Sequence, residues 1–516
     1  MENEKDTQTI LEQEVAPEDI TIKPEEAARL GEQLERQEQS EELLAAAQGK
    51  EAARPELESE IDTVHFTKND LLRLLLKRQY RELREATEQV QPVDLAEILE
   101  DMDENNRLVA FRLLRKSVAA EVFSYLDPDV RADMVEAFSD AELRTALEQM
   151  SLDDAADFLE DMPASVVQRI LEKSSKKTRD SLNKLLHYPE DSAGSIMTPE
   201  YVRLRRNDTV SQAFDTIRRY GENAETVYTC FVVEKHQLIG VVSAKDLMLA
   251  ELDEKIADIM DENVITVKVT DDKEFVAREM QRYDFTAMPV LDGENLMVGI
   301  VTIDDAVDVL TDESTEDMQK MAAILPSDEA TSYFGTSVLM HAKQRIPWLL
   351  LLMLSATFTG MIVNKYQAAF AAVPVLVSFL SMLSGTGGNC GSQTSTMVIR
   401  GMALGEIRMR DFFKVMWKEF RIAILCSVVL AVVNAGRIIL VYHNDTSVDC
   451  YKLALTVSLA IVATVILSKL IAAMLPMAAK KLKLDPAIMA APLITTIVDT
   501  CSTLMFFALA TVIFDI

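Results

Sequence analysis

The stretch LSGTGGNCGSQTSTMVIRG, at Leu383–Gly401, forms the end of a long segment that carries no charge before Arg400. No Asp, Glu, Lys or Arg occurs between Gln367 and Arg400, so the segment is suited to lipid. It is nevertheless rich in flexible residues, the glycines being Gly385, Gly387, Gly388 and Gly391. Two interpretations are open: the glycines let two helices pack closely, or they break a helix and expose its carbonyl groups to a water-filled path. A phosphate-binding loop is disfavoured because no Gly-Lys-Ser/Thr follows.

Five apolar runs, each near the roughly 20 residues that a bilayer requires, follow residue 345. They lie at 346–363, 368–399, 420–442, 453–475 and 486–514. Lys and Arg concentrate in the connections after the second and fourth runs, which predicts that these connections are cytoplasmic. We therefore expect a multi-pass protein of the plasma or inner membrane, with residues 1–345 cytoplasmic and the C-terminus outside. Buried helices of a large soluble protein are the alternative, and they would not explain the alternation of charge.

The last apolar run contains a single internal charge, Asp499. A carboxylate inside a membrane span costs about 2.5–3.5 kcal/mol on insertion scales, so it normally faces a water-filled path or a partner. We expect Asp499 to line an ion path; the alternative is a protonated side chain that joins helices. Arg437 and Lys469 are expected near span ends, where their charged groups reach the interface.

Neutral oxygen atoms accompany this carboxylate in the glycine-rich segment. They belong to Asn389, Gln393, Thr394 and Thr396. Oxygen ligands of this kind, together with one carboxylate, indicate a hard divalent cation.

The charge of the chain is unevenly distributed. The formal net charge is -31, and the part from His341 onward holds 8 acidic and 15 basic residues. The part before it holds 75 acidic and 37 basic residues, a net charge of -38. Such an acidic part argues against nucleic acid as a partner and is typical of a surface that meets cations.

The cysteine and histidine patterns argue against an enzyme. Five cysteines are scattered without a C-x-x-C spacing, five histidines show no metal-binding spacing, and no nucleophile–base set is visible. The first ten residues, MENEKDTQTI, do not form a signal peptide. Residues 1–64 are rich in Glu and Gln, which predicts disorder or a loose helix.

Residues 65–194 are predicted to form an acidic, superhelical α-helical domain. The segment LAEILEDM at 95–102 recurs loosely as AAEVFSYL at 119–126 and as AADFLEDM at 155–162. Asp153 and Asp157 are four residues apart and hence on one helix face, which a solvated surface would also explain.

Two copies of one α/β pattern follow, at 195–254 and 255–313. TCFVVEKHQLIGVVSAKDLMLA and FTAMPVLDGENLMVGIVTIDDAVDVL each predict strand, turn, strand and helix, and a helix precedes each copy. The pair resembles CBS domains, regulatory modules that often bind adenine nucleotides such as ATP. The resemblance implies that ribose and phosphate would be held by Ser243, Asp246, Thr302 and Asp305. The same Ser/Thr-x-x-Asp spacing is also that of a helix N-cap.

An acidic run, Asp304–Asp317, leads into a predicted connecting helix at 314–345 whose basic end meets the bilayer surface. A solvated charged face would explain the run. Its place between a regulatory pair and the membrane favours a cation-dependent switch instead.

Over residues 65–516 the sequence resembles the MgtE family of magnesium channels. The order of domains is the same, and GTGGNCGSQTSTMVIRGMALGEI at 385–407 and PLITTIVDTCSTLMFFALA at 492–510 are similar to the two pore motifs of that family. The resemblance implies a homodimer in which the second and fifth spans of both subunits, within the 346–516 membrane domain, line one pore. The pore residues it implies are Asp499, Asn389, Thr495, Gly385 and Gly388. The cytoplasmic Mg²⁺ ligands it implies are Asp153, Asp157, Asp272, Asp284, Asp305, Asp308, Glu313, Glu316 and Asp317.

We therefore expect a Mg²⁺-selective channel driven by the membrane potential and closed by cytoplasmic Mg²⁺. Cys390 beside the pore motif supports one alternative, a broader channel or exchanger for Co²⁺ or Mn²⁺. A membrane-anchored nucleotide sensor is a second alternative, and it would leave Asp499 without a role.

Overall fold

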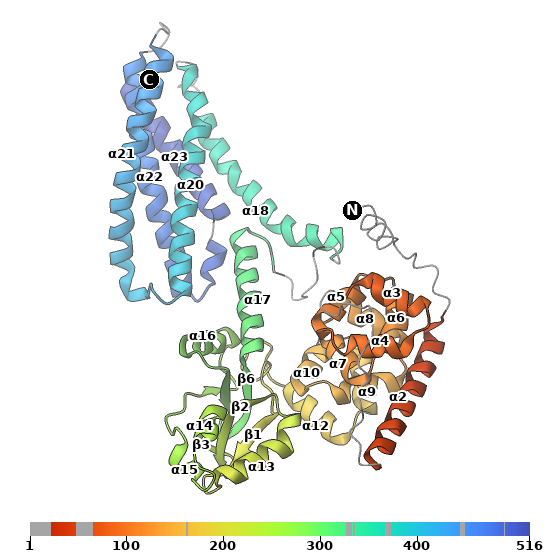
Figure 1. The fold of residues 1–516 in the computed structure, drawn as a ribbon. Coiled ribbons are helices and arrows are strands. Elements are labelled where there is room, and N and C mark those ends of the chain that lie inside the picture. Colours follow the sequence, from red (N-terminus) through yellow and green to blue (C-terminus); the bar gives the residue numbers. More distant parts are fainter. Residues whose placement is uncertain are drawn as a thin grey trace, which may run out of the picture. The chain divides into compact units, whose positions relative to one another are not determined.

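The computed structural model describes residues 22–47, 66–160, 162, 164–326, 333, 336–366, 371, 373–443, 449–489 and 491–515. The chain divides into two compact units, one of Met1–Leu310 with Glu329–Gly335 and one of Thr311–Asp328 with Thr336–Ile516 (Figure 1). In the N-terminal segment predicted to be disordered or loosely helical, the described part contains helix α2 (Pro24–Ala47). The remainder of that prediction lies outside the described residues.

The first unit begins with short helices that confirm the predicted helical segment. They are α3 (Lys68–Leu76), α4 (Tyr80–Thr87), α5 (Pro92–Glu100), α6 (Glu104–Leu113), α7 (Lys116–Tyr125), α8 (Pro128–Ala137), α9 (Asp140–Gln149), α10 (Leu152–Glu160), α11 (Ala164–Lys173) and α12 (Lys176–Leu185). Proline starts α5 and α8, where its missing N–H is not needed, and a Ser139–Glu142 capping box starts α9. Aromatic side chains from the repeated segments meet in the core, with the rings of Phe123 and Phe158 5.3 Å apart.

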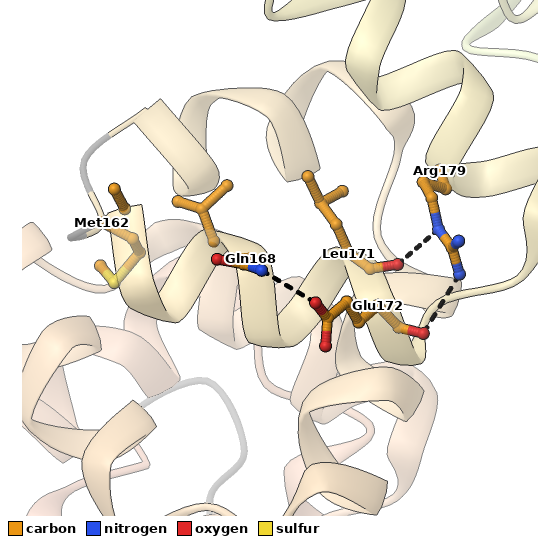
Figure 2. A pocket seen from close by; sticks show the side chains of 7 residues that line it. Met162, Gln168, Leu171, Glu172 and Arg179 are labelled. Carbon is orange, nitrogen blue, oxygen red and sulfur yellow. Dashed lines mark hydrogen bonds between the residues drawn. The ribbon is translucent and has the colours of Figure 1, made fainter.

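Two arginines close the C-terminal ends of helices α5 and α11 in this domain. Arg107 donates to the carbonyl oxygens of Leu99, Glu100 and Met102 at the end of α5. Arg179 does the same at the end of α11, with donor–acceptor distances of 2.6 Å to Leu171 and 3.1 Å to Glu172 (Figure 2). These contacts satisfy carbonyls that have no partner within their own helix. The pocket of Figure 2 is therefore built around a helix end, and its other lining residues are mainly apolar.

The same unit contains two small sheets that confirm the paired α/β pattern. The first has β1 (Tyr201–Leu204), β2 (Thr226–Glu234) and β3 (Gln237–Ser243), with α13 (Val210–Tyr220) and α14 (Ala244–Leu249). The second has β4 (Val267–Lys268), β5 (Ala287–Leu291) and β6 (Met297–Thr302), with α15 (Ile256–Ile259) before it and α16 (Lys273–Tyr283) and α17 (Ile303–Met321) as its helices. In each sheet the first strand pairs parallel and the third antiparallel to the second.

The second unit is a bundle of long helices. They are α18 (Val338–Lys365), α20 (Val377–Ala403), α21 (Phe412–Tyr442), α22 (Cys450–Lys481) and α23 (Ala491–Phe514). Four segments are long and apolar enough to cross a membrane: Val338–Lys365, Met409–Tyr442, Cys450–Lys481 and Pro486–Phe514. The remaining predicted span, 368–399, corresponds to α20, which lacks that degree of apolarity because of its glycines and polar side chains. The described part of the predicted connecting helix at 314–345 falls on the end of α17 and the start of α18.

Candidate cation sites

Asp499 lies in α23 and faces α20. The hydroxyl of Ser384, on α20, donates a hydrogen bond of 2.6 Å to Oδ1 of Asp499. The helices α20, α22 and α23 are in contact with one another and run side by side in Figure 1. The carboxylate therefore has a partner that sequence reasoning did not identify.

Gly387, Gly388 and Gly391 of α20 form a close packing face and do not break the helix. A Cβ on Gly387 would lie 2.7 Å from Val498 and 2.9 Å from Thr464, and one on Gly391 would lie 2.7 Å from Ile494. Because α20 is helical from Val377 to Ala403, the broken-helix interpretation is wrong for these residues and the packing interpretation is confirmed. The small side chains bring the backbone of α20 close to α22 and α23.

The residues predicted to line the pore divide into two groups. Gly388 lies against Thr495, whose Cγ2 would be 3.0 Å from a Cβ at that position. Together with the Ser384–Asp499 bond, this contact places Thr495 and Asp499 where α23 meets α20. Gly385 and Asn389 are instead exposed, one helical turn apart on α20, and Gln393 follows on the same exposed face. An amide in lipid has no hydrogen-bond partner, so this face requires water or another protein surface.

Thr394, in the first of the two motifs, takes part in a buried ionic contact with Lys469 and Glu419. The contact shows that the expected position of Lys469, near the end of a span, is wrong. Lys469 is 5% exposed and lies well inside α22. Its Nζ donates to the hydroxyl of Thr394 over 3.0 Å and lies 4.0 Å from Oε2 of Glu419. The Thr394 hydroxyl in turn donates to Glu419 over 3.0 Å. Thr394 therefore faces the bundle interior, and Lys469 does not reach the interface. The rule that singled out Asp499, a lone charge within an apolar run, would also have singled out Lys469.

Asp153, Asp305 and Glu225 form an electrostatic cluster in the first unit. Asp153 and Asp305 were predicted as cation ligands, and Glu225 was not. Asp153 on α10 is 7% exposed, and its Oδ1 has no hydrogen-bond partner among the residues that the structure describes. Burial, followed by repulsion from Asp153, raises the pKa of Asp305 to about 8. Burial and repulsion from Asp153 also raise the pKa of Glu225 to about 7. The carboxylates of Asp305 and Glu225 are thus close enough to Asp153 to be repelled by it. Because Asp153 is buried, the solvated-surface interpretation is wrong for this residue.

The other predicted sensor residues have different surroundings. Asp272 caps α16 by accepting from the N–H of Phe275 over 3.0 Å, and Asp284 ends that helix in the left-handed region at φ 54°. Glu316 on α17 accepts from Lys320 over 2.6 Å. The described residues contain no group of three or more Asp, Glu, His or Cys side chains placed to hold one metal ion. Asp157 and Asp308 are exposed.

The two predicted nucleotide pairs each lie at the start of a helix in this structure. The Ser243 hydroxyl donates to Oδ2 of Asp246 over 2.5 Å, in a capping box at the start of α14. The Thr302 hydroxyl donates to Oδ2 of Asp305 over 2.7 Å at the start of α17. The N-cap interpretation is therefore confirmed for Ser243 and Asp246, while nucleotide binding stays a prediction.

Comparison with known proteins shows which proteins this chain is similar to in sequence. The chain is 36% identical to the magnesium transporter MgtE of Thermus thermophilus over 84% of its own length and 96% of that protein. It belongs to the MgtE family of magnesium transporters. The MgtE of Bacillus subtilis is 32% identical over 85% of this chain and 95% of that protein. The chain is a multi-pass membrane protein.

The family models match the domains in the order in which the structure presents them. The divalent cation transporter model of MgtE matches 380–509, the MgtE intracellular N domain matches 90–191, and CBS domains match 193–253 and 256–312. The transporter model thus covers most of α20 and α23 and includes Ser384 and Asp499. A solved cytosolic domain of the Mg²⁺ channel MgtE in complex with ATP is 40% identical, covering 46% of this chain and 98% of that one, with a TM-score of 0.44.

Proposed function

We propose that this MgtE-family chain forms a homodimeric, Mg²⁺-selective channel in the cell membrane, with its N-terminus in the cytoplasm. The bonded pair Ser384–Asp499, held between two closely packed helices of the family's transporter region, carries the proposal. The exposed amides of Asn389 and Gln393 on α20 support a second subunit, since they would then face a shared aqueous path and not lipid.

The proposed path binds Mg²⁺ through its hydration shell. Mg²⁺ gives up water reluctantly and usually keeps several waters in protein sites. Two copies of Asp499 near one axis would repel each other, and a divalent ion is their natural counter-charge. Inward movement of a divalent ion gains about 4.6 kcal/mol per 100 mV of membrane potential, so no catalytic step is required.

Closure by cytoplasmic Mg²⁺ is proposed from the acidic cluster around Asp153. Asp305 and Glu225 have strongly raised pKa values because they are partly desolvated and lie close to Asp153. A bound cation would remove this repulsion and hold the helical domain against the CBS pair. Loss of Mg²⁺ would restore the repulsion and separate the domains, and α17 and α18 would then release the pore. Further proposed ligands are Asp157, Asp272, Asp284, Asp308, Glu313, Glu316 and Asp317.

Adenine nucleotide binding to the CBS pair is proposed as a modulating event. It would require the hydroxyl–carboxylate bonds Ser243–Asp246 and Thr302–Asp305 to rearrange toward ribose and phosphate. Calorimetry of the full chain with ATP, ADP and AMP tests this. No heat of binding from any of them at millimolar concentration would contradict it.

Mg²⁺ uptake into proteoliposomes under an imposed membrane potential tests the proposed function. We expect potential-driven Mg²⁺ flux that Ca²⁺, Co²⁺ and Mn²⁺ compete with only weakly. Comparable flux of Co²⁺ or Mn²⁺ would favour a broader divalent cation channel. Nucleotide binding without flux of any cation would favour a membrane-anchored sensor.

A further inference from the structure

Helix α22 holds the glycine-rich helix α20 at two separate points. The hydroxyl of Ser468 donates to the backbone carbonyl of Gly387 over 2.5 Å, and Nζ of Lys469 donates to Thr394 over 3.0 Å. Ser468 and Lys469 are adjacent on α22, whereas their partners are seven residues, about two turns, apart on α20. Two contacts spaced along a helix fix both its height and its rotation.

The second contact is an ionic one that lies almost completely inside the protein. The side chains of Lys469 and Glu419 are 6% and 12% exposed, and Thr394 is 2% exposed. The Thr394 hydroxyl accepts from Lys469 and donates to Glu419, so its proton has one defined direction. The three residues come from α22, α20 and α21, and the contact therefore joins three helices at one point.

Stability alone does not explain why charged residues occupy this position. Removing two charges from water is expensive, and apolar side chains of similar volume are often as stabilising as a buried ion pair. The best-attested benefit of such a pair is that it selects one helix register over its alternatives. The glycine face of α20 has no side chains of its own, and the directional contact at Thr394 adds a fixed point that opposes sliding or rotation of this helix.

We propose that Lys469 and Glu419 are positioning residues of the ion path, acting on α20 through the hydroxyl of Thr394. Since α20 is one continuous helix, its rotation at Thr394 sets the directions of Asn389 and Ser384, five and ten residues earlier. Ser384 in turn holds the Asp499 carboxylate. This inference rests on the proposed function, in which α20 and α23 line the path.

The Thr394→Val variant tests the inference, because valine keeps the shape of threonine and lacks its hydroxyl. Mg²⁺ flux into proteoliposomes is measured against Mg²⁺ concentration, with Ca²⁺ as competitor. We expect the half-saturating Mg²⁺ concentration or the Mg²⁺/Ca²⁺ selectivity ratio to change about five-fold, the effect of losing one buried hydrogen bond. Thr394→Ser is the matched control: it keeps the hydroxyl and should remain within about two-fold of wild type on both measures.

The charged residues are tested in the same assay. Lys469→Met and Glu419→Gln each leave one partner buried without its counterpart, so each single variant should be more impaired than the double variant. Variants that lower only the maximal flux, with half-saturation and selectivity as in wild type, would show a merely structural role and overturn the inference. An absence of flux in wild type would instead refute the proposed channel itself, and this inference with it.

Discussion

Ser384 on α20 and Asp499 on α23 are joined by a 2.6 Å hydrogen bond in which the hydroxyl donates to the carboxylate. The bond connects the two helices whose motifs resemble those of the pore. One oxygen of the carboxylate is thereby held in a fixed direction.

Asp499→Asn should abolish Mg²⁺ flux or its selectivity, because the amide keeps the shape of the side chain and removes its charge. The fold should persist, since a costly charge inside a membrane span is lost. Flux in proteoliposomes and thermal unfolding in detergent measure the two effects separately. Ser384→Ala is the comparison variant: it leaves the charge in place and should weaken Mg²⁺ affinity without abolishing flux. Unchanged Mg²⁺ affinity and selectivity in Asp499→Asn would make the carboxylate structural.

Gly387→Ala should destabilise the membrane domain by about 1–3 kcal/mol, the usual effect of an added methyl in a tightly packed site. The new Cβ would lie 2.7 Å from Val498 and 2.9 Å from Thr464. Gly385→Ala is the matched control on the same helix, because no atom lies within 4 Å of a Cβ there. The midpoint of thermal unfolding in detergent should fall for Gly387→Ala and stay near wild type for Gly385→Ala. Equal stability of the two variants would contradict the packing face.

Much of this architecture was predictable because its signals are local. The period of apolar residues identified the short helices, and two copies of one strand–helix pattern identified the CBS pair. Asp499 was identified because a single charge in a long apolar run has few structural explanations. These inferences need only the sequence near each residue.

The partners of those residues were not predictable, because they come from distant parts of the chain. Nothing near Asp499 indicates Ser384, which lies 115 residues earlier. Lys469 was expected at an interface because the sequence does not show how α20 and α21 enclose it. The choice between a packing face and a broken helix likewise depended on Val498 and Ile494 of α23, which fill the space that the glycines leave.

Neutralising Asp305, Asp308 and Glu316 together, as Asn, Asn and Gln, should weaken closure at millimolar Mg²⁺ and leave conduction intact. With fewer carboxylates, the acidic surfaces repel less and bind Mg²⁺ less well. Limited proteolysis of the full chain, with and without Mg²⁺, reports the closed cytoplasmic part, and flux reports conduction. Asp499 remains in this variant, so selectivity should match wild type. If Mg²⁺ protects the variant from proteolysis as well as it protects the wild type, these residues are not part of the sensor.

The metal-free cytoplasmic part should be more stable at pH 6 than at pH 9. Burial beside Asp153 raises the folded-state pKa of Glu225 to about 7 and of Asp305 to about 8, above their values in an unfolded chain. Their stabilising contribution is therefore present at low pH and lost as pH rises through 7 and 8. Thermal unfolding in EDTA across this range measures the effect. Mg²⁺ should reduce this dependence of stability on pH, because it binds the ionised carboxylates. Glu225→Gln should remove the part of the dependence that lies near pH 7.

A second ionic contact links the end of α17 to the segment that precedes α23. Nζ of Lys320 lies 2.6 Å from Glu316 and 2.7 Å from Asp485, and the Lys320 side chain is 20% exposed. Burial lowers the pKa of Lys320, but the hydrogen bonds to Asp485 and Glu316 outweigh it and raise the pKa above its ordinary value. Glu316 is also a proposed Mg²⁺ ligand, so bound Mg²⁺ would compete with Lys320 for the Glu316 carboxylate. Lys320 would then keep only its contact with Asp485.

Lys320→Met should therefore uncouple closure from Mg²⁺ binding. The Mg²⁺ concentration that halves flux should rise by up to about five-fold, which corresponds to an ion pair of up to about 1 kcal/mol. Protease protection of the cytoplasmic part by Mg²⁺ should persist, because the other proposed ligands are untouched. Asp485→Asn should shift closure in the same direction, and the double variant should add little to either single change, since both remove one contact. Two results would show that signals reach α23 by another route. One is additive effects of the two substitutions, and the other is closure of Lys320→Met with the Mg²⁺ dependence of the wild type.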